Sequence, residues 1–430
     1  MPASRLGEPE DLWHCDVLVI GAGPAGAAAA IEASRNGLNT VVIDKARFPR
    51  DKCCGDGLTT GALRHLDHLG LNPGLLPSWA TVSDVHVVGP NKRSTRFPLP
   101  TGPGTYAAVC RRRELDQALV ELARRNGASV LEGHELDSVS SAAQWVEATA
   151  NGVRFRARFV LAADGMWSPT RKLLGVAQPG YRGEWHAFRQ YFSDVSGPAA
   201  SELLVWFEPD LLPGYAWSFP LAGGSANVGF GIHRGSGYGI QNMARVWPEL
   251  LARPHIAAAL GPEATPESPH RAWPIPARLP KATLAHGRVL FLGDAATATD
   301  PMTGEGIGQA LETGRQAVAA IIGAGLDRPA AVAARYESEL RHGMMRDHRL
   351  AQALTRVLEH RRPTMAALAL AGSTSWTRAN FGRWLFEDYP RAALFTPHRW
   401  NRHLLRAPGA FSQLANLAPR EPSAESSARS

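Results

Sequence analysis

Residues 16–44 read DVLVIGAGPAGAAAAIEASRNGLNTVVID. Residues 16–20 are a short apolar run typical of a buried strand, and the Ala-rich segment that ends near Gly37 is typical of a helix. Residues 39–44 predict a second strand. A strand, a crossover helix and a second strand form a right-handed βαβ unit in a parallel sheet. The fold is therefore expected to contain a parallel sheet with helices packed on it.

The turn between the first strand and the helix reads Gly21-Ala22-Gly23-Pro24-Ala25-Gly26. Gly21 permits a tight turn, Gly23 lets the backbone approach a pyrophosphate, and Gly26 lets the helix pack close to the strand. Phosphates are expected at the helix N-terminus, where free N–H groups and the dipole favour negative charge. Asp44 ends the second strand, where an acid accepts hydrogen bonds from an adenosine ribose. The pattern favours dinucleotide binding over an ordinary glycine turn.

Two later stretches favour FAD over NAD. Arg112 opens an Arg-x-x-Leu-Asp pattern at an expected helix start, and Gly293-Asp294 follows an expected strand at 288–292. An Asp at the end of a parallel strand can bind the hydroxyls of a ribityl chain. Asp164-Gly165 marks a third strand end near the cofactor. Each pair alone is typical of a turn, so the prediction depends on their order along the chain.

A helix expected from about 305 to 324 begins at Gly304-Glu305-Gly306-Ile307. Its positive end would face the flavin ring, whose reduced form is negative around N1 and the C2 oxygen. FAD is therefore the expected cofactor. The predicted cofactor-binding residues are Gly21, Gly23, Pro24, Ala25, Gly26, Asp44, Lys45, Arg112, Asp164, Gly165, Gly293, Asp294, Gly304, Gly306 and Ile307.

In this order the motifs resemble the glutathione-reductase-like flavoproteins of the aromatic-hydroxylase type, and within them the geranylgeranyl reductase family. The element Tyr215-x-Trp217-x-Phe219-Pro220, followed by Gly229-x-Gly231, is similar to that family's signature. Residues 49–58, PRDKCCGDGL, resemble the family's loop after the second strand. The similarity runs from about residue 16 to residue 315 and is closest to bacterial menaquinone reductases.

The resemblance implies hydride transfer from reduced FAD to an isolated prenyl carbon–carbon double bond. Such an alkene accepts hydride poorly, so protonation should accompany the transfer and build positive charge on carbon. Aromatic faces stabilise a cation by up to ~2 kcal/mol each when water is excluded. We expect Trp206, Tyr215, Trp217 and Phe219 to line one pocket wall, the last three on one strand face. The same period-two pattern is also typical of core packing.

A general acid is also needed. The candidates are Cys54 and Asp56, which the resemblance places in the loop over the flavin, and Tyr215. With Trp217 they form the predicted catalytic set. Cys53 and Cys54 are alternatively two small buried thiols, and Asp56 a turn residue between glycines. The spacing of the four cysteines matches no metal site, so none is expected.

The fold class expected for the chain is α/β plus β, with a Rossmann-like FAD-binding domain, an inserted antiparallel-sheet substrate domain and a helical C-terminal region. The FAD-binding domain is expected to be discontinuous, at 14–75, 105–180 and 272–330. Short aromatic-rich strands place the substrate domain at 76–104 and 181–271. Helices broken at prolines are expected at 331–416, followed at 417–430 by a polar tail with the composition of a disordered segment.

Positive charge is concentrated in the C-terminal part of the chain. The formal net charge is +7, and residues 341–406 contain twelve arginines against four acidic residues. Such a patch suits an anionic partner, but without a recognised module it does not predict nucleic-acid binding. The segment also contains Trp376, Phe381, Trp384, Phe386 and Trp400. It is expected either to lie at a lipid interface or to be a solvated helical face with a few core aromatics.

Apolar runs in the sequence are too short for the ~18 residues that span a bilayer, and the N-terminus lacks the order of a signal peptide. A cytoplasmic protein is expected, with peripheral contact at the inner face of the cell membrane as the finer possibility. The expected substrate is an isoprenoid lipid or diphosphate: a menaquinone tail, a geranylgeranyl diphosphate, a chlorophyll precursor or an archaeal-type lipid. The electron donor is expected to be NADPH, a ferredoxin or another reductase.

Two further functions stay open from the sequence. One is an FAD-dependent monooxygenase or halogenase acting on an aromatic substrate. A halogenase is expected to carry Trp-x-Trp-x-Ile-Pro, whereas residues 215–220 read YAWSFP, which favours the reductase. The other is a non-catalytic flavoprotein that binds a prenyl lipid, and it is disfavoured because the helix end that would tune the flavin is intact.

Overall fold

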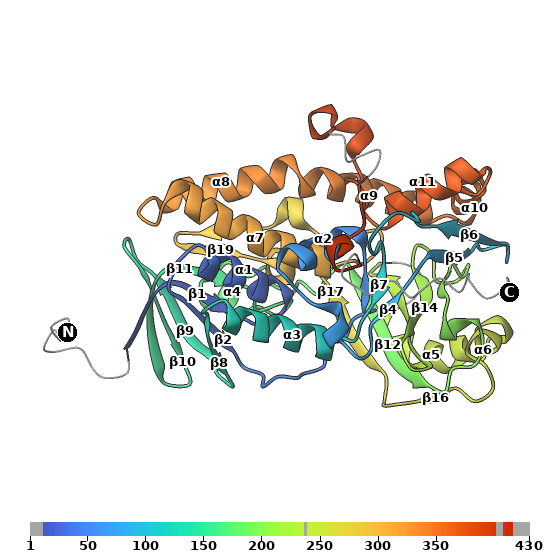
Figure 1. Cartoon of the computed structure of the whole chain (residues 1–430), viewed down its shortest axis with the longest axis horizontal. Helices are drawn as coiled ribbons and strands as arrows, with labels where there is room; N and C mark the ends of the chain where they lie inside the picture. The colour runs from blue at the N-terminus through green and yellow to red at the C-terminus, as the bar shows by residue number, and fades with distance from the viewer. Residues whose placement is uncertain (1–11, 236–238, 401–406, 416–430) are drawn as a thin grey trace, which may run out of the picture.

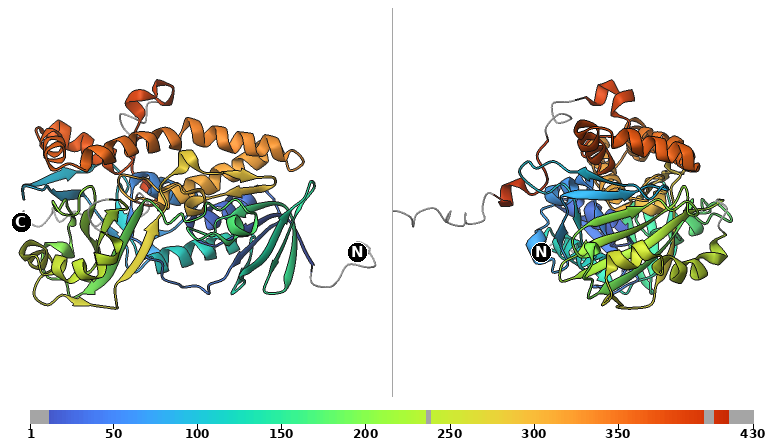
Figure 2. Two further views of the ribbon diagram at one scale, coloured as in Figure 1. Left: turned by 180° about the vertical axis from the view of Figure 1, so that it is seen from behind. Right: turned by 90° about the vertical axis from the view of Figure 1, so that its right-hand side faces the viewer.

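The computed structural model describes residues 12–235, 239–400 and 407–415. Its two large sheets lie at opposite ends of an elongated molecule, the first on the left and the second on the right of Figure 1. A long layer of helices runs along one side of both sheets, as the two views of Figure 2 show. The predicted fold class, a Rossmann-type FAD-binding fold with additional sheet and helical parts, is confirmed. The predicted tail at 417–430 lies outside the described residues.

The first sheet contains the predicted βαβ unit. Its strands are β1 (Leu12–Ile20), β2 (Thr40–Asp44), β8 (Ser129–Glu132), β9 (Leu136–Ser141), β10 (Val146–Ala150), β11 (Val153–Ala162), β18 (Ala285–His286) and β19 (Val289–Phe291). The main order is β18-β19-β11-β1-β2-β8, and β1 pairs in parallel with both β2 and β11. The parallel pairs β11–β19 and β2–β8 extend this core, so the carboxyl ends of five parallel strands meet at one edge of the sheet, which is where ligands bind in open α/β sheets.

Small residues let two helices approach this sheet and each other closely. α1 (Pro24–Arg35) contains six alanines in 12 residues and packs against α7 (Ile307–Ala324). A Cβ at Gly314 of α7 would lie 2.3 Å from the carbonyl oxygen of Ala25. The two helix N-termini, which both begin beside the sheet's ligand edge, are thus fixed relative to each other. The other helices on this side are α3 (Arg112–Arg125), α4 (Pro169–Leu173) and α8 (Pro329–His342).

The second sheet is mostly antiparallel and has the order β16-β12-β15-β14-β13-β5-β6, with β17 paired to β12. Its strands are β5 (Asp84–Val88), β6 (Ser94–Pro98), β12 (Trp185–Ser193), β13 (Leu203–Trp206), β14 (Tyr215–Leu221), β15 (Ser225–His233), β16 (Thr265–Pro266) and β17 (Arg271–Ile275). The expectation of an antiparallel sheet is wrong at one pair, since β13 and β5 run parallel. These two strands come from distant segments, so no hairpin dictates their direction.

The remaining helices join the two sheets. α9 (Met344–Leu358), α10 (Arg361–Ala371) and α11 (Ser375–Leu385) continue the layer begun by α8, and α11 packs on β6 of the second sheet. The junction between the two sheets contains α2 (Thr60–His68) and a small sheet of β3 (Gly57–Leu58), β4 (Ala80–Thr81) and β7 (Ala108–Val109). Two helices pack on the second sheet instead, α5 (Met243–Leu251) and α6 (Pro254–Leu260). Among the described residues, no helix is both long and apolar enough to cross a membrane.

Short elements complete the chain. They are α13 (Ser412–Ala415) and the 3₁₀ helices η1 (Pro73–Leu75), η2 (Pro198–Ala200), η3 (Ile240–Asn242), η4 (Leu279–Lys281), η5 (Gly293–Ala296), η6 (Ala393–Phe395) and η7 (Pro397–Arg399).

Candidate active site

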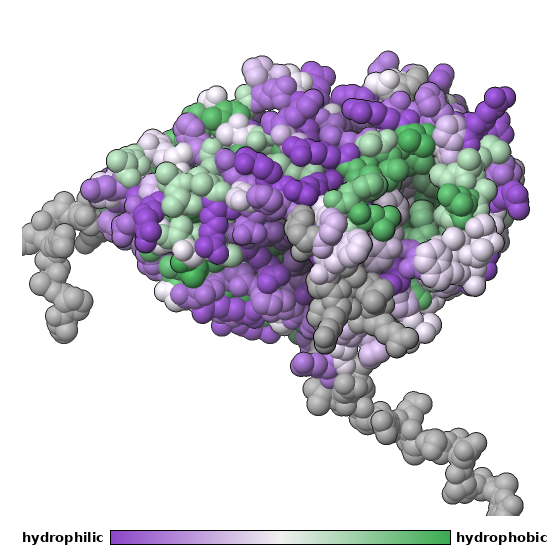
Figure 3. Space-filling view, turned by 90° about the horizontal axis from the view of Figure 1, so that it is seen from above, coloured by the Kyte–Doolittle hydropathy of each residue, from purple (hydrophilic) through white to green (hydrophobic). Residues whose placement is uncertain are grey.

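A cavity of about 880 Å³ lies between the two sheets and beneath the C-terminal helices. Its walls come from the ligand edge of the first sheet, the starts of α1 and α7, the loop after β2 and one face of the second sheet. Seen from above, apolar side chains gather around a hollow on the half of the molecule that carries α10 and α11 (Figure 3). Every predicted cofactor-binding residue except Gly26 lines this cavity, as do all four predicted catalytic residues.

The glycine turn forms one end of the cavity. Gly21 has φ +98°, and a Cβ there would lie 2.4 Å from the carbonyl oxygen of Ala163. Gly26 is a packing residue, because its Cβ would lie 1.8 Å from the carbonyl oxygen of Gly21. Gly23 is the N-cap of α1 and no side chain caps the helix, so its first-turn N–H groups are free to bind a phosphate.

The carboxylate of Asp44 is held by the backbone at the end of β2. Its Oδ2 accepts a hydrogen bond from the N–H of Ala22 (2.7 Å) and its Oδ1 accepts one from the N–H of Ala46 (2.8 Å). Each oxygen keeps a second lone pair, which can accept from a ribose hydroxyl. Lys45 lies at the rim and forms an exposed ion pair with Glu135 at 3.6 Å.

Arg112 is fixed by its own helix. Its Nε and Nη2 each donate to Asp116 at 2.8 Å, and Nη1 of Arg50 donates to the same carboxylate at 3.0 Å. Asp116 is fully buried, so it requires this cationic partnership. The predicted Arg-x-x-Leu-Asp pattern thus places a rigid guanidinium at the cavity wall.

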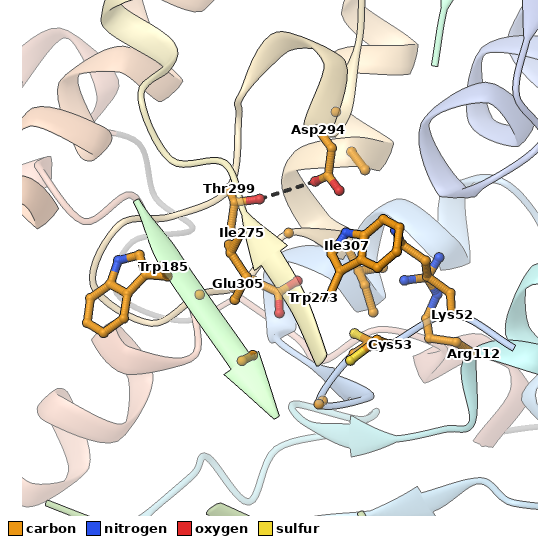
Figure 4. Close-up of a pocket in the computed structure, with 18 of the residues that line it drawn as sticks. Lys52, Cys53, Arg112, Trp185, Trp273, Ile275, Asp294, Thr299, Glu305 and Ile307 are labelled. Carbon is orange, nitrogen blue, oxygen red and sulfur yellow. Dashed lines mark hydrogen bonds between the residues drawn. The ribbon is translucent and has the colours of Figure 1, made fainter. Parts of the chain in front are cut away.

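Two carboxylates at strand ends fit the polar part of a flavin dinucleotide. The Oδ2 of Asp164 accepts from the N–H of Thr170 (2.9 Å), whereas its Oδ1 is buried with no protein partner. Burial raises the pKa of Asp164 above its ordinary value. The Oδ1 of Asp294 accepts from the hydroxyl of Thr299 at 3.3 Å (Figure 4). The orphaned oxygen and the cradle around Gly21 together fit FAD at this site.

The aromatic stripe of β14 forms the wall opposite the cofactor end. Tyr215, Trp217 and Phe219 all line the cavity. Trp217 lies directly across from Gly229 of β15, and Tyr215 across from Gly231. A Cβ at Gly229 would lie 2.3 Å from the Trp217 ring, so this glycine makes room for the indole. The spacing of aromatics and glycines in the signature therefore follows from cross-strand packing.

The prediction that Trp206 belongs to this wall is wrong. Trp206 packs on the other face of β13, in the core formed with α5 and α6. Its neighbours Val205 and Phe207 line the cavity instead. Side chains alternate along a strand, and the register of β13 against β5 and β14 places the odd-numbered residues inward.

The candidate acids differ in their pKa values and in their hydrogen-bond partners. Burial raises the pKa of the Cys54 thiol to about 11, so the sulfur is protonated at neutral pH. Asp56 has no exposed surface, and its Oδ2 accepts from the hydroxyl of Tyr191 at 2.6 Å. Burial raises the pKa of Asp56 to about 6, and nearby Arg189 opposes that rise. The backbone N–H of Asp56 donates to Sγ of Cys54 at 3.4 Å. Cys54 and Asp56 both line the cavity, and this hydrogen bond holds the thiol next to the buried carboxyl.

The hydroxyl of Tyr215 donates to the carbonyl oxygen of Thr303, and burial raises the pKa of Tyr215. The hydroxyl proton of Tyr215 is therefore held in a hydrogen bond to the backbone. Asn227, which no sequence motif marks, connects the β14 wall to the loop that contains Cys54. Its Oδ1 accepts from Nε1 of Trp217 (3.1 Å), and its Nδ2 donates to the carbonyl oxygen of Cys54 (2.8 Å).

Lys52, Trp273 and Glu305 were also missed. The Nζ of Lys52 lies 3.4 Å from the ring centroid of Trp273, and burial lowers the pKa of Lys52 to about 8 (Figure 4). The Oε1 of Glu305 accepts from the N–H of Gly308 at 2.8 Å, at the first turn of α7. Burial and the charge of Glu387 raise the pKa of Glu305. Lys52 lies in the 49–58 loop and Glu305 in the 304–307 motif. Their roles depend on burial of the side chains, which the sequence alone does not indicate.

The far end of the cavity is apolar. Phe381 and Trp384 of α11 and Phe386, which follows it, line it with residues of α9 and α10. Trp376 and Trp400 point to solvent, with 72% and 60% of their surface exposed. The C-terminal aromatics are thus divided between the cavity wall and the outer surface. Among the described residues, no group of three or more His, Cys, Asp or Glu side chains is arranged to hold a metal ion.

Comparisons with known proteins agree with this geometry. A model of the FAD binding domain family matches residues 14–342. Menaquinone reductase from Mycobacterium tuberculosis (strain H37Rv) is 34% identical over 352 residues, which cover 75% of this chain and 80% of that protein. Digeranylgeranylglycerophospholipid reductase 1 from Methanopyrus kandleri is 30% identical over 313 residues, which cover 70% of this chain and 78% of that protein.

Solved structures share the fold. A geranylgeranyl bacteriochlorophyll reductase-like protein from Thermoplasma acidophilum superposes with a TM-score of 0.68 at 21% identity, covering 85% of this chain and 98% of that one. The flavin-dependent halogenase CmlS superposes with a TM-score of 0.66 at 22% identity, covering 82% of this chain and 67% of that one. Because reductase-like and halogenase structures superpose about equally well, the fold alone does not separate the two activities.

Proposed function

The chain belongs to the FAD binding domain family and is an FAD-dependent oxidoreductase, and from this premise we propose that it saturates a carbon–carbon double bond of an isoprenoid chain. The observation that carries the proposal is the composition of the 880 Å³ cavity. One end offers glycines, carboxylates and Arg112, whereas the other is apolar and closed by α9, α10 and α11. A polar cofactor and a long hydrocarbon chain would each find a suitable half.

FAD would be held by the turn at Gly21 and Gly23, by Asp44, by Arg112 and by the strand-end carboxylates Asp164 and Asp294. When bound and reduced, FAD supplies a hydride. The residues of the chain bind the substrate, exclude water and supply the proton. The apolar end excludes water, so a charge that develops on carbon is not quenched by solvent and interacts strongly with its neighbours.

The β14 wall orients and stabilises the alkene. Trp217 and Phe219 present ring faces whose negative quadrupole favours positive charge nearby. Cys54 keeps its proton at neutral pH and lies in the loop that packs on these rings, since a Cβ at Gly55 would lie 3.4 Å from Phe219. We infer that the Cys54 thiol holds the proton closest to the reacting bond.

The substrate proposed first is a menaquinone with an unsaturated tail, because menaquinone reductase is 34% identical to this chain. An isoprenoid lipid or diphosphate of another kind is the alternative within the same class. NADPH acting transiently, a ferredoxin or a separate reductase is proposed as the electron donor. A peripheral contact with a membrane would let a chain that resides in the bilayer enter beneath α10 and α11.

The test is anaerobic turnover of FAD-loaded protein with NADPH or dithionite and a panel of prenyl substrates. The expected product gains two hydrogen atoms per double bond, which mass spectrometry detects. A hydroxylated or halogenated product in air, with no saturated product under anaerobic conditions, would replace the proposal with an oxygen-dependent activity. Unchanged substrate with every donor, despite bound FAD, would leave a lipid-binding flavoprotein.

A further inference from the structure

A second cavity, of about 340 Å³, lies behind the start of α7 and is separate from the flavin cavity. Its walls are highly charged, and they include Asp300, Glu312, Asp347, Glu387, Arg391 and Arg399. They come from the loop between η5 and α7, from α7, from α9 and from the segment after α11. The proposed chemistry gives this cavity no role, yet burying so much charge is costly unless it is paired or used.

One face of α7 connects the two cavities. Glu305 lines the flavin cavity just before the helix begins, and Gln309 and Glu312 line the second cavity. Gln309 and Glu312 are three residues apart and share a face of α7. The carboxylate of Glu305 is tied to the start of the same helix, because its Oε1 accepts from the N–H of Gly308 at 2.8 Å. The Nε2 of Gln309 donates to Oε1 of Glu387 at 3.0 Å, which ties this polar face to the opposite wall.

Glu387 lies between the helix face and the rest of the cavity. Its Oε2 accepts from the hydroxyl of Thr59 (3.2 Å), and Nη2 of Arg391 donates to its Oε1 (3.3 Å). The negative charge of Glu387 raises the pKa of the Glu305 carboxyl. A carboxyl of the second cavity therefore communicates electrostatically with one in the flavin cavity.

Two buried polar atoms without a protein partner fit a second cavity that takes up water. Nη1 of Arg391 and Oε1 of Gln309 are buried without a protein partner, and the two residues are only 4% and 8% exposed. Buried polar atoms are normally satisfied by protein or by ordered water. A polar cavity of this size holds several waters, each with about 30 Å³ of liquid volume.

Protons are available in this cavity near neutral pH. Burial raises the pKa of Glu312 to about 7, Asp347 and Glu387 raise it further, and Arg399 and Arg315 oppose the rise. Burial also raises the pKa of Glu387, which Arg391 opposes and Asp300 and Asp347 support. On the neighbouring elements, burial lowers the pKa values of His65 on α2 and His348 on α9, so neither ring carries the positive charge.

We propose that the second cavity delivers protons to the flavin cavity, through Glu312 and Glu387 to Glu305. The inference rests on the proposed function, which consumes protons behind apolar walls. For each double bond, bound and reduced FAD would supply a hydride to one alkene carbon, with its two electrons coming from the donor named above. The alkene's π electron pair forms the second C–H bond with the proton of the Cys54 thiol, and the resulting thiolate takes up the proton that Glu305 releases. Glu305 regains a proton from Glu387, and Glu387 from Glu312 and cavity water.

The test compares Glu387→Gln and Glu312→Gln with Glu339→Gln, an exposed carboxyl on α8. In single turnovers of FAD-reduced protein with a bound prenyl substrate, each relay variant should saturate the alkene on the order of 10²-fold more slowly. The solvent deuterium isotope effect should increase, and added formate should restore the rate of Glu312→Gln.

FAD affinity should match the control in both variants. Glu387→Gln should lower Tm, because the buried Arg391 keeps only Asp300 as a carboxylate partner. Glu312→Gln should keep the Tm of the control and so tests the relay independently of stability, because Gln keeps an oxygen that accepts from Nε2 of Gln316.

A readout without substrate separates this inference from the proposed function. Infrared difference spectra of FAD-loaded protein should show protonated carboxyl absorption that titrates near neutral pH, and each relay variant should lose part of it. The relay is overturned if the spectra of Glu387→Gln and Glu312→Gln equal the wild-type spectrum, or if both keep the wild-type rate and isotope effect. If the wild type saturates no prenyl substrate, the proposed function fails, and the spectra still decide the relay.

Discussion

Gly229 is the residue that most directly tests how the aromatic wall is built. A Cβ at this position would lie 2.3 Å from both the Trp217 ring and the carbonyl oxygen of Phe188. Gly229→Ala should therefore displace the indole or bend β15, with a loss of about 1–3 kcal/mol in unfolding free energy, as for other overpacked sites. The displaced indole should also lower kcat/KM for the prenyl substrate. Thermal unfolding and steady-state kinetics measure the two effects.

The control is Gly231→Ala, two residues along the same strand. Its Cβ would meet its nearest neighbour, the carbonyl oxygen of His186, at 3.9 Å, which is ordinary contact. Equal losses of stability and turnover in the two variants would mean that Gly229 has no special relation to Trp217.

Cys54 tests the assignment of the proton donor. Cys54→Ala should slow alkene saturation on the order of 10²-fold, because the thiol supplies the nearest proton, and Cys53→Ala should leave the rate close to wild type. A thiol donates only while it is protonated. With a pKa of about 11, its contribution should be constant from neutral to moderately alkaline pH and be lost only as the pH rises through that value.

Single-turnover rates across this pH range, measured with the same prenyl substrate, check both statements. Saturation by Cys54→Ala at the wild-type rate would remove this thiol from the mechanism and leave Glu305 as the proton donor to test next.

Residues whose role is set by local backbone could be predicted from the sequence. Gly21, Gly23 and Asp44 lie in a turn and at a strand end within one βαβ unit, so their spacing was sufficient to predict where they lie. The roles of Asn227 and Lys52 arise from burial and from partners in distant segments. No local pattern distinguishes such an Asn or Lys from any other.

Among the elements, the close pair of α1 and α7 positions both helix N-termini at the cofactor. Gly314→Ala should push α7 away from α1, because its Cβ would lie 2.3 Å from the backbone oxygen of Ala25. We expect FAD affinity to fall at least about tenfold, which corresponds to ~1.4 kcal/mol of binding free energy. Titration of the apoprotein with FAD, followed by flavin fluorescence, measures the change.

Gly308→Ala is the matched control on the same helix, since its Cβ would meet Ala62 at 3.4 Å, an ordinary contact. If the Gly314 variant binds FAD as tightly as this control, the separation of α1 and α7 does not govern the cofactor site.

The strands show where prediction of elements stops. β1 and β2 were visible because apolar runs, a glycine turn and a helix of the right length occur in sequence. The parallel pairing of β13 with β5, which turns Trp206 away from the cavity, joins segments at 84–88 and 203–206. Tertiary packing determines strand pairing of this kind. The period-two pattern therefore could not predict which side chains of β13 line the cavity.

At the scale of the whole molecule, the C-terminal helices had no motif, and their place could not be read from composition. The sequence indicated helices broken by prolines and left their aromatics either in a core or at a lipid interface. In the structure, α9–α11 close the apolar end of the cavity, so one layer both completes the substrate chamber and forms an outer surface (Figure 2). Its positive charge and its exposed aromatics are therefore next to the proposed entrance for the hydrocarbon chain.

The outer surface of this layer exposes Leu370, Trp376, Leu394, Phe395 and Trp400, and Leu394 has 81% of its surface exposed. The segment with η6 and η7 projects from the same side as the helix layer in Figures 1 and 2. Apolar and aromatic side chains beside a cationic segment bind anionic lipid interfaces, at about 1 kcal/mol per basic residue near the surface. We expect the protein to bind vesicles that contain phosphatidylglycerol, and the binding to weaken as salt is raised.

The triple variant Leu394→Ser/Phe395→Ser/Trp400→Ser should sediment far less with such vesicles and reduce bilayer-embedded prenyl substrate more slowly. It should reduce a detergent-dispersed short-chain substrate at the wild-type rate, because these residues lie outside the catalytic cavity. Leu173→Ser, an exposed apolar position on α4, is the control for loss of hydrophobic surface in general. Vesicle binding that survives the triple variant, or is lost equally in the control, would place the lipid contact elsewhere, and the hydrocarbon chain would then have to enter by another side of the cavity.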